Sequence, residues 1–324
     1  MFDVVALGEI LIDFTPHGNS KNGGHLFEQN PGGAPANVLA ALSKQNYKTA
    51  FIGKVGQDEF GDFLKQTLDN SNIDSKALIM TKEANTTLAF VHLENNGERS
   101  FSFYRNPGAD MMLRKDEINK TIIEKTKIFH FGSISMTHEP VASATIAALK
   151  VAKENNVIIS FDPNLRPALW SNLEHAKKMI QTGLTYTDIV KVSEEELQFL
   201  TGTTDLSNGT EKIIKEFDIT FLCVTLGEKG CFYRYKGTEG SVNGFEVSVK
   251  DTTGAGDAFL GGLLAQILSC LDEGIGLSEL NESKLIDIVT FANAVGALST
   301  TKMGAIPSMP TLEEINKLIK KGTY

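Results

Sequence analysis

Three consecutive segments decide the fold: KIFHFG (127–132), PVASATIAALKVAKEN (140–155) and VIISFD (157–162). The first and third are short apolar runs of the kind that form buried strands. The middle segment has apolar residues at helical spacing. A strand, a helix and a second strand in this order predict a βαβ unit with parallel strands, and therefore an α/β fold.

The same alternation extends along the rest of the chain. Further strands are expected in VVALGEILIDF (4–14), TAFIGKVG (49–56), DIVKVS (188–193) and TFLCVT (220–225), and further helices in PANVLAALSKQ (35–45) and DEFGDFLKQTLDNS (58–71). This pattern predicts a mostly parallel central sheet with helices on both faces. Since no linker rich in Pro, Gly or Ser interrupts it, we expect a single domain over residues 1–324.

TTLAFVHLENNGERSFSFYR (86–105) breaks the alternation. Two alternating runs flank Asn95-Asn96-Gly97-Glu98, which is a hairpin signal because the turn needs positive φ. Together with the loop around 15–30, the hairpin is expected to form a small antiparallel β lid, made of about 12–31 and 86–106, over a site at the mouth of the main sheet. A plain surface hairpin is the alternative.

Composition excludes several classes of partner. The 324 residues carry a net charge of −9, which disfavours nucleic acid and anionic membranes. No apolar run approaches the roughly 18–20 residues that a membrane span needs, and the first residues do not resemble a signal peptide. The cysteines, Cys223, Cys231 and Cys270, match no zinc spacing and are expected to be buried or free thiols. A cytoplasmic protein is predicted.

DTTGAGDAFLGGLLAQIL (251–268) has the strongest chemical signal. Because 258–268 is typical of an apolar helix, Gly254-Ala255-Gly256-Asp257 should lie at its entrance. The two glycines allow consecutive N–H groups to point to one place, where the helix dipole also favours an anion. Asp257 could accept the proton of an attacking hydroxyl there. The alternative is that Asp257 only caps the helix.

NPGGAPANVLA (30–40) is a second glycine-rich entrance to a helix. Gly32 and Gly33 permit close approach of a ligand, and Asn37 falls in the first helical turn. With Asp13 at the end of the first strand, these groups suit a polyol. A capped helix with a buried asparagine is the alternative.

Other motifs are missing from the sequence. It has no Walker-type phosphate loop, no Gly-x-Gly-x-x-Gly after the first strand, no His-Glu-x-x-His and no Gly-x-Ser-x-Gly. The missing dinucleotide fingerprint disfavours an oxidoreductase. His130, within an apolar strand, is expected to be a core residue with its hydrogen bonds satisfied.

Taken together, GGAPAN (32–37) and DTTGAGDAF (251–259) resemble the paired motifs of the ribokinase-like, PfkB-type sugar kinase family. The resemblance continues in GKVGQDEFG (53–61), DPNLRPALW (162–170), TLGEKG (225–230) and GAIPSMP (304–310). Within the family, SFYRNPGADMML (102–113) and KVSEEELQFLTG (191–202) are most similar to bacterial and plant fructokinases. The resemblance implies a ribokinase-like fold and phosphoryl transfer from ATP to a sugar hydroxyl.

The resemblance also implies roles for individual residues. Asp257 matches the catalytic base, and Gly254, Ala255 and Gly256 match the anion hole. Substrate contacts are implied for Asp13, Gly32, Gly33, Asn37, Arg105 and Arg166, although the two arginines could instead form surface ion pairs. ATP contacts are implied for Ser193, Thr225, Gly227, Gly230, Asn293 and Ala297, while Lys229 could reach phosphate or be solvated.

Metal sites and assembly follow from the same resemblance. Glu196 matches the residue that holds Mg²⁺ through water. A monovalent cation, expected to be K⁺, is implied beside Asp251, Thr253, Gly304 and Ser308. Ser193 stands where ribokinase-like members commonly have Asn, which favours the fructokinase branch. A homodimer formed through the lid is also implied.

Several functions remain open from the sequence. An ATP-dependent fructokinase that makes fructose 6-phosphate is the first hypothesis. The alternatives are a 2-keto-3-deoxygluconate kinase, another PfkB-type sugar or riboside kinase, and a catalytically silent sugar-binding relative.

Overall fold

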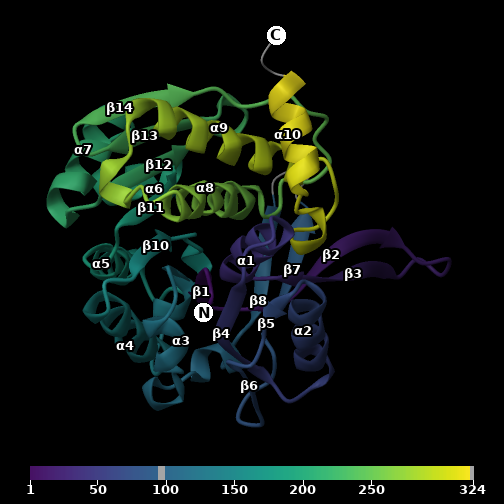
Figure 1. Cartoon of the computed structure of the whole chain (residues 1–324). Helices are drawn as coiled ribbons and strands as arrows, with labels where there is room; N and C mark the ends of the chain where they lie inside the picture. Colours follow the sequence, from purple (N-terminus) through teal and green to yellow (C-terminus); the bar gives the residue numbers. More distant parts are fainter. Residues whose placement is uncertain (94–98, 322–324) are drawn as a thin grey trace.

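The computed structural model describes residues 1–93 and 99–321 (Figure 1). Ten strands form the main sheet: β1 (Val4–Leu7), β4 (Thr49–Gly56), β5 (Ile73–Asp74), β6 (Leu78–Thr81), β9 (Ile128–Gly132), β10 (Ile158–Asp162), β11 (Ile189–Ser193), β12 (Phe221–Thr225), β13 (Cys231–Tyr235) and β14 (Thr238–Val242). Their order is β14-β13-β12-β11-β10-β9-β1-β4-β5, with β6 also paired to β4. The pairings are parallel except those of β13 with β12 and with β14.

The helices cover both faces of this sheet (Figure 1). They are α1 (Ala34–Lys44), α2 (Glu59–Asn70), α3 (Lys120–Glu124), α4 (Val141–Glu154), α5 (Leu173–Leu184), α6 (Glu194–Thr201), α7 (Leu206–Phe217), α8 (Ala255–Asp272), α9 (Glu282–Ser299) and α10 (Leu312–Lys321). Since successive residues of a strand face opposite sides, Val4 and Ala6 join one core with α1 and α8, whereas Val5 and Leu7 join a second core with α4. The predicted α/β fold is confirmed.

A second sheet has the strand order β3-β2-β7-β8. It consists of β2 (Leu11–Asn19), β3 (His25–Gly32), β7 (Leu88–Leu93) and β8 (Arg99–Tyr104). The outer pairings are antiparallel, but β2 and β7 are parallel. In Figure 1 the β2–β3 hairpin extends away from the main body. The turn predicted at Asn95-Asn96-Gly97-Glu98 lies outside the described residues.

Two expectations for the N-terminal region were wrong. VVALGEILIDF does not form one strand: β1 ends at Leu7, and β2 begins at Leu11 in the other sheet. Asp13 therefore lies near the start of a strand of the second sheet. The segment around 15–30, expected as a loop, is mostly the β2–β3 hairpin. Its polar residues occupy exposed strands, where no apolar pattern marks them.

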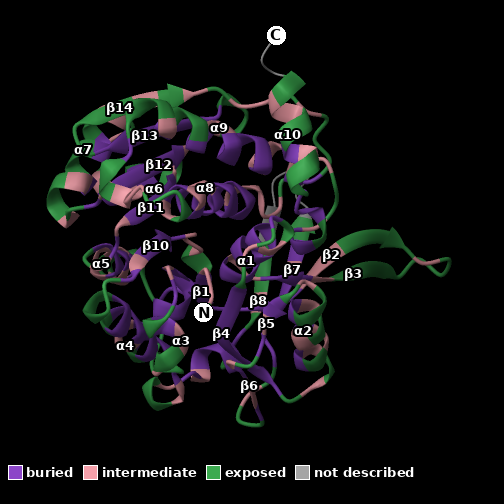
Figure 2. Cartoon of the chain, in the orientation of Figure 1, coloured by how far each residue is buried: buried purple, intermediate pink, exposed green. Residues whose placement is uncertain are grey.

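The expectation that no apolar segment reaches the length of a membrane span was also wrong. Among the described residues, α8 is long and apolar enough to cross a membrane, judged by its length and composition alone. The helix is mostly buried, with α1 and α9 packed against it (Figure 2). A helix that is apolar all round is expected when neighbouring helices cover several of its faces.

Candidate active site

The entrance of α8 is built around Gly254. This residue precedes the helix and has a left-handed backbone, with φ of 75°. A Cβ atom there would also lie 2.8 Å from the Cβ atom of Ala305. The N–H of Ala255 donates to the carbonyl of Thr252 at 3.2 Å. Those of Gly254, Gly256 and Asp257 donate to no acceptor in the part of the chain that the structure describes, so they remain available to an anion.

Gly256 is a glycine for a different reason from the one predicted. It lies inside α8 and does not have a positive φ. A Cβ atom at Gly256 would lie 2.7 Å from Nζ of Lys191. A side chain at this position would have to displace the Lys191 ammonium group, so glycine here allows the close approach of Lys191 and is not needed for a turn of the backbone.

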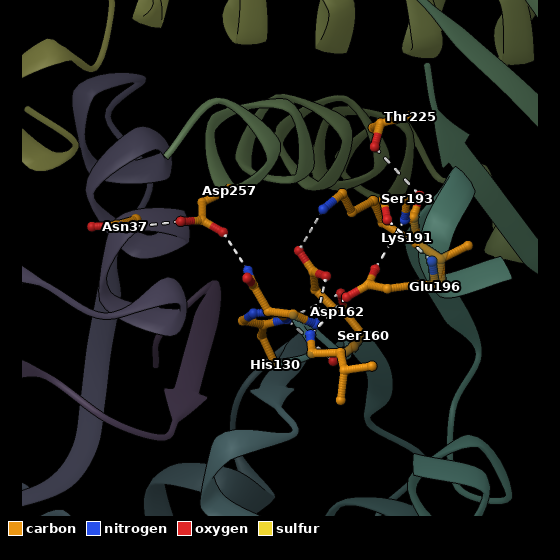
Figure 3. Close-up of polar contacts among 12 residues, drawn as sticks. Asn37, His130, Ser160, Asp162, Lys191, Ser193, Glu196, Thr225 and Asp257 are labelled. Carbon is orange, nitrogen blue, oxygen red and sulfur yellow. Dashed lines mark hydrogen bonds and ion pairs between the residues drawn. The ribbon is translucent and has the colours of Figure 1, made fainter. Parts of the chain in front are cut away.

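Asp257 is held by two side-chain amides (Figure 3). Asn37 Nδ2 donates to Oδ2 at 2.7 Å, and Asn164 Nδ2 donates to Oδ1 at 3.0 Å. The alternative that Asp257 caps the helix is wrong, since no side-chain cap is present at this end of α8. Burial raises the pKa of Asp257 to about 6, and the nearby charge of Asp162 adds to this rise. The carboxylate is thus a stronger base than an exposed aspartate.

A row of polar side chains lies beneath the α8 entrance. Alternate residues of β9, β10 and β11 face this helix, which places His130, Asp162 and Lys191 on its side of the sheet. Lys191 Nζ forms a buried ion pair with Asp162 Oδ2 at 2.9 Å. Asp162, Asn164 and Lys191 were not among the predicted site residues. For Asp162 and Lys191 the available signal was a polar residue at an inward position of a strand otherwise rich in apolar residues.

His130 is fully buried, as predicted, but only one of its ring nitrogens has a partner. Nδ1 lies 3.2 Å from the carbonyl oxygen and 3.3 Å from the hydroxyl of Ser160. Nε2 has no partner in the described structure. Burial lowers the pKa of His130 to about 4, so the ring is neutral at pH 7.

Asp13 and Arg166 lie close enough to Asp257 to interact with its charge. Burial raises the pKa of Asp13 to about 6, while the charge of Arg166 opposes this rise and that of Asp257 adds to it. Arg166 is half-buried, and its guanidinium donates only to the carbonyl of Leu165 within the described residues. Two carboxylates therefore face one guanidinium that still has free donors.

The N-terminus of α1 supports this side of the site. Gly33, which precedes the helix, has φ of 125°, and a side chain there would collide with the carbonyl oxygen of Glu9. A side chain at Gly32 would collide with the carboxylate of Asp13. Asn37 is buried, and its Oδ1 has no partner among the residues described. Of the alternative, a capped helix with a buried asparagine, the burial of Asn37 is confirmed, but no side chain caps the start of α1.

A cavity of about 140 Å³ separates the second sheet from the loops near the α8 entrance. Asp13, Thr15, Asn30 and Phe101 line it on the side of the sheet, and Asp251 and Gly304 line it on the side of the loops. The second sheet thus forms one wall of an opening that reaches Asp13.

Arg105 differs from the expected arrangement. Its Nε donates to Asp110 Oδ2 at 2.7 Å, Nη1 to the hydroxyl of Thr137 at 3.0 Å, and Nη2 to the carbonyl of Ile134 at 3.3 Å. It is buried, so it is not a surface ion pair. Since Asp110 neutralises it, it provides little charge to a ligand.

Several of the residues expected to contact ATP lie at the carboxyl ends of β11 and β12 or in the turns after them. Ser193 caps α6, and its hydroxyl accepts from the N–H of Glu196. The Glu196 carboxylate accepts from the N–H groups of Ser193 and Leu165, at 2.9 and 2.7 Å. Burial raises the pKa of Glu196. Because each oxygen retains a further lone pair, this carboxylate can still accept from the water of a hydrated metal ion.

The remaining expected residues surround the same edge of the sheet. Thr225 ends β12, and its hydroxyl donates to the carbonyl of Val192 at 3.4 Å. Gly227 and Gly230 adopt positive φ in the turn before β13. The side chain of Asn293 on α9 donates to the carbonyls of residues 242 and 243 at 3.0 and 3.1 Å, so it holds this loop. Ala297 lies one turn later.

The loops expected to bind a monovalent cation are tied together by Asp251. Its Oδ1 accepts from the N–H and hydroxyl of Thr253, and Oδ2 accepts from the N–H of Gly304. Ser308 is buried and donates to the carbonyl of Ala305. These hydrogen bonds hold the two loops together, and backbone carbonyls of the loops can serve as cation ligands.

The chain is similar to several known proteins. It is 46% identical to the probable fructokinase-4 of Arabidopsis thaliana over an alignment of 319 residues. This alignment covers 98% of this chain and 96% of that protein. The crystal structure of fructokinase with bound ATP from Xylella fastidiosa matches with a TM-score of 0.92 at 34% identity, covering 100% of both chains. A double mutant of the fructokinase of Vibrio cholerae O395, in the fructose, ADP and potassium ion bound form, matches with a TM-score of 0.88 at 36% identity, covering 98% of both. Residues 1–312 match the pfkB family of carbohydrate kinases, and the chain belongs to this family of sugar phosphotransferases.

Proposed function

We propose that this protein is an ATP-dependent fructokinase that converts D-fructose and ATP into fructose 6-phosphate and ADP. The observation that carries the proposal is the position of Asp257: a buried carboxylate, held by Asn37 and Asn164, lies next to free N–H groups at the entrance of α8. The fructokinase names of the relatives in two kingdoms support the choice of sugar.

In the proposed reaction, Asp257 accepts the proton of a primary sugar hydroxyl. The oxygen of that hydroxyl forms a bond to the γ-phosphorus while the bond to the bridging oxygen of ADP breaks. The N–H groups of Gly254, Gly256 and Asp257 hold the phosphoryl oxygens, and the helix dipole offsets their charge. Asn37 and Asn164 keep the carboxylate oriented, so little reorganisation is needed.

The charges near Asp257 favour a neutral sugar over an acidic one. An acidic substrate such as 2-keto-3-deoxygluconate needs a cation that is not already neutralised. Arg105 is paired with Asp110, and Arg166 faces both Asp13 and Asp257. A polyol can instead donate hydroxyls to Asp13 and accept from Arg166 and from the amides of α1. Gly32 and Gly33 allow the sugar to approach the backbone.

For the nucleotide, we place ATP across the ends of β11 and β12, against Ser193, Thr225, Gly227 and Gly230, with the base near Asn293 and Ala297 on α9. Mg²⁺ supplies charge neutralisation of the phosphates when bound. The described residues contain no cluster of three acidic, His or Cys ligands, so Glu196 would hold the ion through water. K⁺ would occupy the loops joined by Asp251, Thr253, Gly304 and Ser308, with carbonyl ligands.

The second sheet is proposed as the lid of a single domain over residues 1–324 and as the surface of a homodimer. Leu26, Phe27, Phe101 and Tyr104 are exposed apolar side chains on its strands. A second copy of the sheet would cover them. The cysteines are buried free thiols, which supports a cytoplasmic location.

A panel of acceptors tests the function. Purified protein is incubated with Mg²⁺-ATP and fructose, ribose, 2-keto-3-deoxygluconate or a purine riboside, and ADP release is measured. We expect kcat/KM to be highest for fructose, with fructose 6-phosphate as the product. Equal or faster turnover of another acceptor would reject fructose, and the absence of turnover with every acceptor would favour a silent relative. Thermal stabilisation by NAD but not by Mg²⁺-ATP would reject the kinase.

A further inference from the structure

Lys191 is a buried cation that the reaction described above does not use. It lies in β11, and the alternation of that strand directs its side chain towards α8 (Figure 3). The side chain is 7% exposed. Its Nζ lies so close to Gly256 that a Cβ atom built there would be only 2.7 Å away. The ammonium group therefore lies at the helix entrance that has the free N–H groups.

Only one of the three ammonium N–H donors has an acceptor in the described structure, which is Asp162 Oδ2 at 2.9 Å. Burial alone would lower the pKa of Lys191, but the charges of Asp162, Glu196 and Asp257 outweigh it and raise the pKa. The group is thus charged and has two donors left. Asp162 fixes its direction.

A contribution to the stability of the fold does not explain the buried ion pair between Lys191 and Asp162. Removing two charges from water costs about as much as their attraction returns, and apolar residues of the same size often stabilise a protein more. A buried ammonium group with unused donors is explained if an anion completes its hydrogen bonds. The amides of α8 favour an anion at the same place.

We infer that Lys191 contacts the phosphoryl group that is transferred, with its Nζ donating to an oxygen of the γ-phosphate. Asp162 is the positioning residue that aims the ammonium group. Lys191 keeps its protons throughout and stabilises the charge on the phosphoryl oxygens as the bond to ADP breaks. The inference rests on the proposed function, because it needs ATP at the α8 entrance.

The test compares the binding of ATP with that of ADP, because only ATP has the γ-phosphate. Lys191→Met is compared with the wild type by calorimetry, without sugar and with Mg²⁺. The double variant Asp162→Asn/Lys191→Met is included because the single change leaves Asp162 buried and unpaired, which can impair folding. Lys54→Met is the matched control: Lys54 is also buried on a central strand and paired, with Glu117 at 2.7 Å, but in β4.

In both Lys191 variants we expect the affinity for ATP to fall at least tenfold more than that for ADP, and kcat to fall at least 100-fold. Lys54→Met should change both affinities equally. Equal loss of ATP and ADP affinity in the Lys191 variants would overturn the inference. So would recovery of kcat at higher pH, because Lys191 would then act only by adjusting the basicity of Asp257. If the wild type binds ATP but phosphorylates no sugar, the proposed function fails, whereas the difference between ATP and ADP still tests Lys191.

Discussion

Asn37 and Asp257 are 220 residues apart in the chain, yet the side-chain amide of Asn37 donates to Asp257 Oδ2 at 2.7 Å. The packing of α1 against α8 brings them together. One hydrogen bond thus joins the two glycine-rich helix entrances. The groups expected to hold the sugar and those expected to hold the phosphate therefore share one carboxylate.

Asp257→Asn should remove the base without disturbing its surroundings. Asn164 can still donate to the remaining oxygen, and Asn37, whose Oδ1 has no partner among the described residues, can turn its amide to accept from the new N–H₂ group. Since a general base typically contributes a factor of about 10²–10⁴ to the rate, we expect kcat to fall by a factor of this size or more. ATP affinity, measured by calorimetry, should change less than threefold. Asp272→Asn, at the other end of α8 and exposed, is the control and should be fully active. A Asp257→Asn enzyme with more than a tenth of wild-type turnover would exclude Asp257 as the base.

The raised pKa of Asp257 predicts the pH dependence of turnover. A base must be ionised, and burial raises its pKa to about 6. We therefore expect kcat/KM for fructose to rise about tenfold per pH unit below pH 6 and to level off above it. Asp13 has a similar pKa and interacts with Asp257, so the apparent value belongs to the pair. A rate that is constant between pH 4.5 and 7 would contradict the assignment.

Gly254 and Gly274, at the two ends of α8, allow a matched comparison. Both have positive φ, of 75° and 81°, but a Cβ atom at Gly274 would meet nothing within 4 Å. Each change to Ala should lower the free energy of unfolding by about 1–2 kcal/mol, because a residue with a Cβ atom is strained at positive φ. Only Gly254→Ala should also displace the α8 entrance from Ala305 and lower kcat by about 10²-fold or more. Denaturant unfolding and steady-state kinetics measure the two effects. Equal activity in both variants would argue against an anion hole at this end.

The main sheet and its helices could be predicted because their apolar residues repeat with regular periods. TAFIGKVG was predicted as a strand, and β4 has these same bounds. The β2–β3 hairpin could not be predicted in this way, because its strands are exposed and contain polar residues. Their pattern was therefore interpreted as a loop.

The site was only partly predictable for a different reason. Asp257 stands out in its motif, whereas Lys191 and Asp162 are polar residues inside apolar strands, and their pairing depends on the neighbouring positions of β10 and β11. Strand order is not visible in local sequence. The engagement of Arg105 by Asp110 likewise requires the tertiary structure.

The exposed apolar side chains of the second sheet predict its role in dimerisation. Phe27 and Tyr104 are 40% and 66% exposed. Replacing Phe27 by Asp would place a charge in the proposed interface, so we expect a monomer in light scattering where the wild type is a dimer. Leu173→Asp is the control, because Leu173 is 51% exposed on α5. A monomeric wild type would contradict the proposal, as would dissociation by both variants alike.

Glu9 should make the protein less stable at alkaline pH. It is buried, its Oε1 accepts from the N–H of Ala34, and its Oε2 has no partner in the described residues. Burial raises the pKa of Glu9 from 4.5 to about 7. The folded state therefore binds the proton of Glu9 more tightly than the unfolded state does. Protonated Glu9 contributes its full stabilisation below pH 4.5, and this stabilisation is lost as the pH rises through 7.

Glu9→Gln keeps an acceptor for Ala34 and stays neutral at every pH. At pH 8.5 the variant should be more stable than the wild type by up to about 3 kcal/mol, the free energy equivalent of the change in pKa. At pH 4.5 the two proteins should differ little. Urea unfolding at both pH values measures this difference in the free energy of unfolding. The contributions of the other buried carboxylates cancel in the comparison, because both proteins contain them. A variant that is destabilised equally at both pH values would show that the Glu9 carboxylate is ionised and fully compensated in the folded protein.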